Sequence, residues 1–126
     1  MLVKKQIFIV DDDRQMLSLL RDVFEIEGWR VTVAANISQA KEYLESSVPD
    51  CFVIDLKLPD GDGSEFIHYL NSRYETPIMA ISGAISGSDT FNLPATKQMG
   101  ADYHMSKPFE PDELIIECKR LMEVES

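Results

Sequence analysis

Three aspartates carry the chemistry that this sequence suggests most clearly. Asp11 and Asp12 follow the apolar run 7–10, and Asp55 follows the apolar run 51–54. Carboxylates that converge on one spot repel one another unless a cation lies among them, which indicates a divalent metal site. Mg²⁺ is the expected ion, because it prefers oxygen ligands, keeps several waters and commonly joins carboxylates to a phosphoryl group.

Two further polar residues, Ser82 and Lys107, suggest what such a metal site does. Each follows a strand-like segment, and the ammonium of Lys107, together with Mg²⁺, would offset negative charge on the oxygens of a transferring phosphoryl group. Asp55 would then be the nucleophile, because a carboxylate that attacks phosphorus forms an aspartyl phosphate. These residue types predict phosphoryl transfer to Asp55.

Short β-rich segments alternate with amphipathic segments along the chain, and this alternation decides where the polar residues lie. The expected strands are residues 7–10, 31–34, 51–54, 77–81 and 103–106. Strict alternation of strands and helices implies right-handed crossovers and a parallel sheet covered on both faces. Functional groups of such a sheet lie at the carboxyl ends of the strands, so all five polar residues would meet at one edge.

Apolar periodicity and end signals predict the helices between the strands. Asp13 is interpreted as a cap or dipole partner of the first helix, which ends before Gly28. Asn36 and Gln39 resemble a capping box, and Ser64 is the expected cap of the third helix. The faces expected to be buried are Met16, Leu20, Val23 and Phe24, then Ala40, Tyr43 and Leu44, then Phe66, Ile67 and Leu70, and finally Leu114, Ile115, Cys118, Leu121 and Met122.

The segment 83–99 is the least regular part of the chain, because Gly, Ser and Pro94 interrupt any helical period. A fourth helix is expected to begin near Pro94, since proline is tolerated at the first helical position. The fold class is then α/β, a doubly wound five-stranded parallel sheet in the order 2-1-3-4-5 with five helices, like flavodoxin. The length of 126 residues and the 44% hydrophobic content predict one domain over residues 1–126.

Composition narrows the classes of function. A formal net charge of -10 argues against a nucleic-acid or anionic-membrane surface, and it suits either a basic partner or simple solubility. Cys51 and Cys118 have no framework spacing, so they are interpreted as buried thiols of a reduced compartment. The sequence contains no secretory signal and no run approaching the roughly 20 apolar residues of a membrane span, which predicts a soluble cytoplasmic protein.

Four motifs taken together resemble the receiver domain of two-component response regulators, from Gln6 to about Val124. They are the strand with its acid pair at 7–12 (IFIVDD), the segment 55–63 (DLKLPDGDG), Ser82-Gly83, and Lys107-Pro108-Phe109. The resemblance implies a metal site formed by Asp11, Asp12, Asp55 and the backbone carbonyl of Lys57. It also makes Asp55 the phosphoacceptor.

The resemblance implies roles for three more residues. Ser82 would hydrogen-bond the phosphoryl group, Lys107 would pair with its charge, and the peptide bond between Lys107 and Pro108 would be cis. Ser82 and His104 would change position together on phosphorylation. Histidine stands here where Tyr or Phe is more usual, and its titration leads to the hypothesis of a pH-sensitive switch.

The implied function is a phosphorylation-dependent signalling switch, which catalyses only its own phosphorylation and dephosphorylation. A sensor histidine kinase or phosphotransfer protein would supply the phosphoryl group, and a downstream protein or output domain would respond, without direct contact to nucleic acid or membrane. Two alternatives stay open. One is a non-phosphorylated binding module, which the intact site residues disfavour. The other is an aspartate-nucleophile phosphatase, whose second acid would stand at the position of Lys57.

Overall fold

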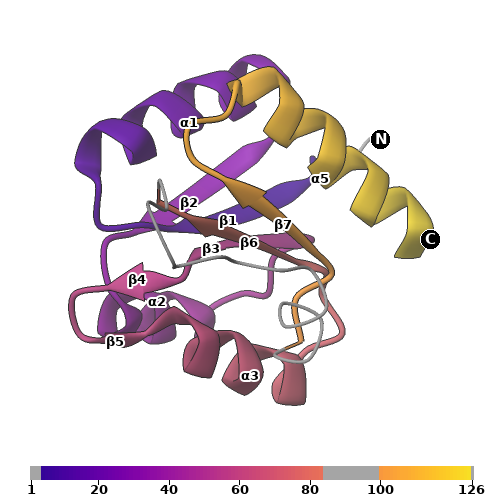
Figure 1. Ribbon diagram of the computed structural model, residues 1–126. Helices are drawn as coiled ribbons and strands as arrows, with labels where there is room; N and C mark the ends of the chain where they lie inside the picture. The colour runs from indigo at the N-terminus through magenta and orange to yellow at the C-terminus, as the bar shows by residue number, and fades with distance from the viewer. Residues whose placement is uncertain (1–3, 84–99, 126) are drawn as a thin grey trace.

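Five strands form one parallel sheet that places the carboxyl ends of its strands along a single edge. The computed structural model describes residues 4–83 and 100–125 (Figure 1). Its sheet consists of β1 (Gln6–Val10), β2 (Arg30–Ala34), β3 (Cys51–Asp55), β6 (Ile78–Ser82) and β7 (Tyr103–Ser106). The order is β2-β1-β3-β6-β7 and every neighbouring pair is parallel. The predicted order 2-1-3-4-5 is confirmed when the strands of this sheet are counted along the chain.

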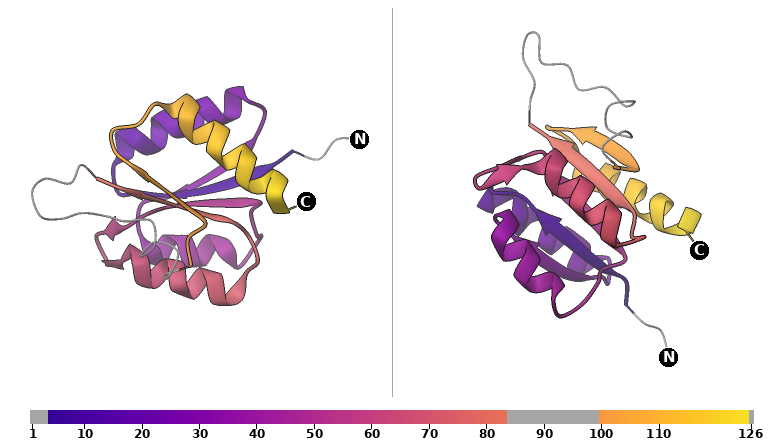
Figure 2. Two further views of the ribbon diagram at one scale, coloured as in Figure 1. Left: turned by 45° about the vertical axis from the view of Figure 1, so that its right-hand side comes forward. Right: turned by 90° about the horizontal axis from the view of Figure 1, so that it is seen from below.

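Helices cover both faces of the sheet, as a doubly wound fold requires. Helices α1 (Arg14–Ile26) and α5 (Pro111–Glu125) lie on one face, and α2 (Ile37–Leu44) and α3 (Gly63–Arg73) lie on the other (Figure 2). The predicted helix near Pro94 falls on residues 84–99, outside the described residues. Within residues 4–83 and 100–125, no helix has the length and apolar character needed to cross a membrane.

The sheet separates two hydrophobic clusters, one under each pair of helices. Successive residues of a strand point to opposite faces, so Ile7 and Ile9 join the cluster under α1 and α5, while Phe8 and Val10 join the cluster under α2 and α3. All of β3 is buried, which is expected for a central strand of a parallel sheet. The burial of β3 fixes the position of the carboxylate at its end.

The predicted buried helix faces are largely confirmed. On α3 and α5 the buried residues include Phe66, Ile67, Leu70, Leu114, Ile115, Cys118 and Met122. On α1, Leu17 is buried as well, although it lies outside the predicted face. The prediction for Tyr43 is wrong, because its side chain is 44% exposed and its ring meets Phe8 edge-on at the rim of the cluster, 6.2 Å between centroids. A tyrosine at a rim keeps its hydroxyl in water.

Local capping sets where α1 and α2 begin and end. Asp13 caps α1 by accepting hydrogen bonds from the first backbone N–H groups of the helix, and Gly28 follows its end with φ of 92°. At α2 the cap by Asn36 is confirmed, because its Oδ1 accepts from the N–H of Gln39 at 2.8 Å, whereas the return bond differs from that of a standard capping box: Gln39 Oε1 accepts from the N–H of Ala35 at 2.8 Å and not from that of Asn36.

An antiparallel hairpin stands between β3 and α3, in a segment whose Pro, Asp and Gly residues are typical of turns. It pairs β4 (Lys57–Leu58) with β5 (Gly61–Asp62). The prediction of Ser64 as the cap of α3 is wrong. Asp62 is the cap, because its carboxylate accepts from the backbone N–H of Ser64 at 2.9 Å and from the Ser64 hydroxyl at 2.7 Å. Both residue types cap helices, and the pairing of β5 holds Asp62 in the extended conformation that a cap needs.

Candidate functional site

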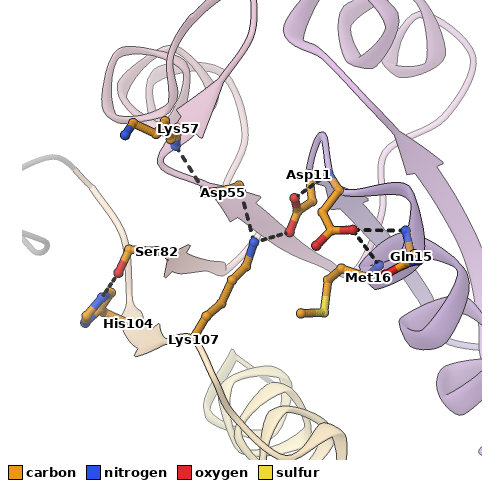
Figure 3. Close-up of polar contacts among 9 residues, drawn as sticks. Asp11, Gln15, Met16, Asp55, Lys57, Ser82, His104 and Lys107 are labelled. Carbon is orange, nitrogen blue, oxygen red and sulfur yellow. Dashed lines mark hydrogen bonds and ion pairs between the residues drawn. The ribbon is translucent and has the colours of Figure 1, made fainter. Parts of the chain in front are cut away.

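The carboxyl ends of four strands bring the predicted site residues to one edge of the sheet (Figure 3). Asp11 follows β1, Asp55 ends β3, Ser82 ends β6 and Lys107 follows β7. Asp11, Asp12 and Asp55 each offer one carboxylate oxygen, and these atoms lie within 4.8 Å of one another. The three acids therefore lie close together, as the sequence predicts, and their functional roles remain predictions.

Asp11 is the most buried of these acids, with no solvent exposure. Its backbone N–H donates to the carbonyl of Ala34 at 3.1 Å, and its Oδ1 accepts from the backbone N–H of Asp13 at 2.9 Å. Its Oδ2 forms an ion pair with Nζ of Lys107 at 2.8 Å and has no further partner among the described residues. A buried carboxylate oxygen of this kind has capacity for another cationic partner.

Lys107 places its ammonium between two acids. Nζ of Lys107 donates to Oδ2 of Asp55 at 3.2 Å while it pairs with Asp11 (Figure 3). Burial opposes the charge of the ammonium, but the contacts with Asp11 and then with Asp55 outweigh burial, so the pKa of Lys107 is raised. The ammonium is therefore a permanent positive charge at this edge of the sheet.

Asp55 is 4% exposed, and its surroundings oppose its ionisation. Burial is the largest cause and raises the pKa of Asp55 to about 6. The backbone N–H of Lys57 donates to Oδ1 of Asp55 at 3.1 Å and lowers this pKa, while the charge of Asp11 raises it and that of Lys107 lowers it. The charge of Lys107 and the N–H of Lys57 therefore offset the effect of burial on Asp55 only in part.

The donor set fits a divalent cation with oxygen ligands. Three carboxylates share a small volume with one ammonium, so the group has an excess of negative charge. Oδ2 of Asp11 has only the Lys107 ammonium as a partner among the described residues, and the charge of Asp11 adds to burial in raising the pKa of Asp55. Hard cations such as Mg²⁺ bind to such oxygens, and a histidine or cysteine ligand is absent from this cluster of described residues.

Ser82 and His104 form a second contact beside the acids. Oγ of Ser82 lies 3.0 Å from Nε2 of His104, across the parallel pair of β6 and β7 (Figure 3). Burial lowers the pKa of His104, so the imidazole is neutral at pH values where free histidine begins to titrate. The predicted partners of the switch are therefore in contact.

The loop that follows Asp55 is held tightly against it. The N–H of Gly63 donates to the carbonyl of Leu56 at 2.9 Å, and a side chain at Gly63 would overlap the backbone oxygen of Asp55.

The peptide bond between Lys107 and Pro108 is cis, which confirms the expectation from the resemblance.

Sequence reasoning missed one residue of this region, Asp60. Its carboxylate contacts the start of α2, and the only local signal was that aspartate favours turns. His68 is exposed on α3 and is not part of this site.

Comparison with known proteins agrees with this geometry. The family described as "Response regulator receiver domain" matches residues 7–119. The transcriptional regulatory protein CpxR of Escherichia coli is 31% identical over 117 residues, which are 93% of this chain and 49% of that protein. This chain therefore spans about half the length of that regulator.

A relative of similar length and a solved structure extend the comparison. Sporulation initiation phosphotransferase F of Bacillus subtilis is 31% identical over 125 residues, 99% of each chain. The receiver domain of the Francisella response regulator 1452 superimposes with a TM-score of 0.86 at 27% identity, covering 98% of this chain and 100% of that one. Both resemblances include the strand ends that carry the acids.

Proposed function

This chain belongs to the response regulator receiver domain family, and we propose that Asp55 is the residue that accepts the phosphoryl group. As a receiver domain the chain is a phosphorylation-dependent signalling switch. The observation that carries the assignment of Asp55 is its position. Asp55 is the last residue of the central strand, and its carboxylate lies 3.2 Å from the Lys107 ammonium. One oxygen of this carboxylate and one from each of Asp11 and Asp12 lie within 4.8 Å of one another.

Mg²⁺ is the proposed cofactor. The carboxylates of Asp11, Asp12 and Asp55 and the backbone carbonyl of Lys57 would hold it. When bound, Mg²⁺ neutralises negative charge on the phosphoryl oxygens and on the acids. The shortage of positive charge among the described residues of this cluster supports the assignment.

Asp55 and Lys107 have complementary roles in the proposed reaction. An ionised carboxylate oxygen of Asp55 attacks the phosphorus of a phosphohistidine donor, so that a P–O bond forms while the P–N bond breaks. The electron pair of the broken bond stays on the imidazole nitrogen of the donor. Lys107 stabilises negative charge on the phosphoryl oxygens while the phosphoryl group moves to Asp55. Hydrolysis returns the domain to its unphosphorylated state, because water attacks the same phosphorus and releases phosphate and the Asp55 carboxylate.

Ser82 and His104 are the proposed switch. The hydroxyl of Ser82 would leave His104, its partner at 3.0 Å, and donate to a phosphoryl oxygen on Asp55. The imidazole then loses that hydrogen bond and can take another position on the edge strand β7. The change of surface around His104 would be read by a downstream protein or output domain.

The proposed phosphoryl donors are a sensor histidine kinase or a phosphotransfer protein, and the proposed compartment is the cytoplasm. The family assignment supports these donors, since receiver domains work with histidine-phosphorylated partners. The chain catalyses only its own phosphorylation and dephosphorylation in this proposal. It has no separate substrate.

Acetyl phosphate with Mg²⁺ tests the assignment. Intact-mass measurement should show the addition of one phosphoryl group to the wild-type chain and none to Asp55→Asn. Asp22→Asn, an exposed aspartate on α1, is the matched control and should react like the wild type. Turnover of small phosphate esters would instead indicate a phosphatase. No mass change in any variant would indicate a binding module.

A further inference from the structure

The tip of the β4–β5 hairpin is attached to the start of α2 by one side chain. Oδ1 of Asp60 accepts from the backbone N–H of Ile37 at 2.9 Å, and Oδ2 accepts from that of Ser38 at 3.0 Å. The first N–H groups of a helix have no partner inside the helix, and Asn36 satisfies only the N–H of Gln39. A carboxylate from a distant part of the chain therefore completes the cap of α2.

Apolar residues of the hairpin and of the start of α2 also pack together. Ile37 packs against the cluster under α2 and α3, and a side chain at Gly61 would come within 2.8 Å of its Cδ1 atom. Leu58, on the other strand of the hairpin, is buried in the same cluster. The hairpin is thus seated on α2 with the Asp60 carboxylate at the outer end of the contact.

The inner end of the hairpin is the acidic site itself. Lys57, the first residue of β4, donates its N–H to Asp55 at 3.1 Å. On the opposite side, the N–H of Asp11 is bonded to the carbonyl of Ala34, the last residue of β2. Asp60 therefore closes a circuit of contacts that runs from Asp11 through β2 and α2 to the hairpin and back to Asp55.

We propose that Asp60 is a positioning residue of the cation site, which holds the hairpin so that the Lys57 carbonyl and the Asp55 carboxylate face the same ion. This inference rests on the proposed function, because it takes the Lys57 carbonyl as a ligand. A two-stranded hairpin is at best marginally stable alone, so its geometry depends on the surface to which it is fixed. Hydrogen bonds that orient the ligands of a metal site contribute to metal affinity in the same way.

Two variants of the full chain and one control test the inference. Asp60→Ala removes both acceptors, whereas Asp60→Asn keeps one acceptor oxygen. Glu42→Gln removes one charge from an exposed position of α2 and is the charge-matched control. Backbone NMR spectra of each chain report hydrogen exchange at the amides of Ile37 and Ser38. Titration with Mg²⁺, followed at the amide of Lys57, gives the Kd.

The expected result is a graded loss of affinity. Asp60→Ala should speed exchange at both amides and raise the Kd for Mg²⁺ about three- to tenfold, with Asp60→Asn in between and Glu42→Gln unchanged. Saturating Mg²⁺ should restore the rate of phosphorylation of Asp60→Ala by acetyl phosphate, because the defect lies in binding. A purely structural cap would not show this rescue by the ion.

Three outcomes would overturn one or both proposals. Faster exchange in Asp60→Ala with a Kd within about twofold of the wild type would overturn the positioning role, because Asp60 would then only cap α2. Mg²⁺ binding by the wild type without phosphorylation would overturn the proposed function, while the Kd comparison would still decide the role of Asp60. Absence of Mg²⁺ binding by the wild type would overturn both.

Discussion

Nζ of Lys107 lies 2.8 Å from Oδ2 of Asp11, a side chain with no exposure to solvent. The same ammonium bonds Asp55 at 3.2 Å, so two buried acids share one lysine. Removing one partner of a buried ion pair leaves the other charge without compensation, which is more destabilising than loss of an exposed pair. The stability of the metal-free domain therefore depends on this lysine.

Lys107→Met should lower the free energy of unfolding by about 1–3 kcal/mol at about pH 7 in a chelator, measured by urea denaturation. Lys119→Met is the matched control. Lys119 pairs with Glu27 at 3.0 Å, but the two side chains are 48% and 39% exposed, so its loss should change stability by no more than about 0.5 kcal/mol. Equal losses in the two variants would show that the central ion pair is no stronger than a surface pair.

Asp55→Asn should stabilise the metal-free domain above neutral pH. Burial raises the pKa of Asp55 from 3.8 to about 6, so the folded state holds the proton more tightly than the unfolded chain. The resulting penalty is absent below about pH 4, grows towards about pH 6 and is complete above it. The variant should therefore gain about 1–2 kcal/mol at about pH 7.5 in a chelator and nothing at about pH 4. A gain that is independent of pH would contradict the charge argument.

His104→Phe should flatten the acid side of the stability profile. Burial lowers the pKa of His104 below its ordinary 6.5, so the unfolded chain binds the proton first as the pH falls. Wild-type stability should decrease from about pH 7 to about pH 5, and the variant should lose that part of the slope. Urea denaturation at several pH values measures it, with the exposed His68→Phe as control. Parallel profiles of His104→Phe and the wild type would contradict the prediction.

The same lowered pKa sharpens the hypothesis of a pH-sensitive switch. Because His104 is neutral near pH 7, a response to pH is expected on the acid side of 6.5 rather than across the neutral range. The affinity of the phosphorylated form for its partner should change with pH in the wild type and not in His104→Phe. An unchanged difference between the two chains from about pH 5 to 8 would remove the hypothesis.

Gly63→Ala should disturb the loop around the acids. A side chain at Gly63 would overlap the backbone oxygen of Asp55 and approach Cα of Leu56 to 2.5 Å. Neither backbone atom can rotate away, so the expected loss of stability is about 1–3 kcal/mol, with a weaker affinity for Mg²⁺. Gly83→Ala, where no atom of the described residues lies within 4 Å of the added carbon, should change stability by no more than about 0.5 kcal/mol. Calorimetric melting of both variants compares them directly.

The sheet and the convergence of the acids could be predicted because both depend on patterns within short segments. The apolar run before Asp55 matches β3, which is buried over its whole length and ends with that aspartate. Parallel topology then brings Asp11, Asp55 and Lys107 together, although they lie far apart in the sequence. The site could be predicted although its residues come from several segments, because right-handed crossovers between parallel strands bring the carboxyl ends of these strands to one edge.

Contacts between distant segments were beyond the reach of these patterns. Asp60 meets Ile37 and Ser38 more than twenty residues away, and nothing near Asp60 in the sequence identifies those partners. The choice between Asp62 and Ser64 as a helix cap failed for a related reason. Both residues are good caps, and the pairing of β5 decides between them.

The strand order also places the site residues on strands that differ in how firmly the sheet holds them. Asp55 ends β3, which is bonded to a neighbour on each side, whereas β7, which precedes Lys107, is bonded to β6 alone among the described strands. A border strand gives way at a lower free energy than a central one. The phosphoryl group would therefore bind to a residue of a rigid central strand. His104 and Lys107, which respond to it, lie on or next to the strand that can move more easily.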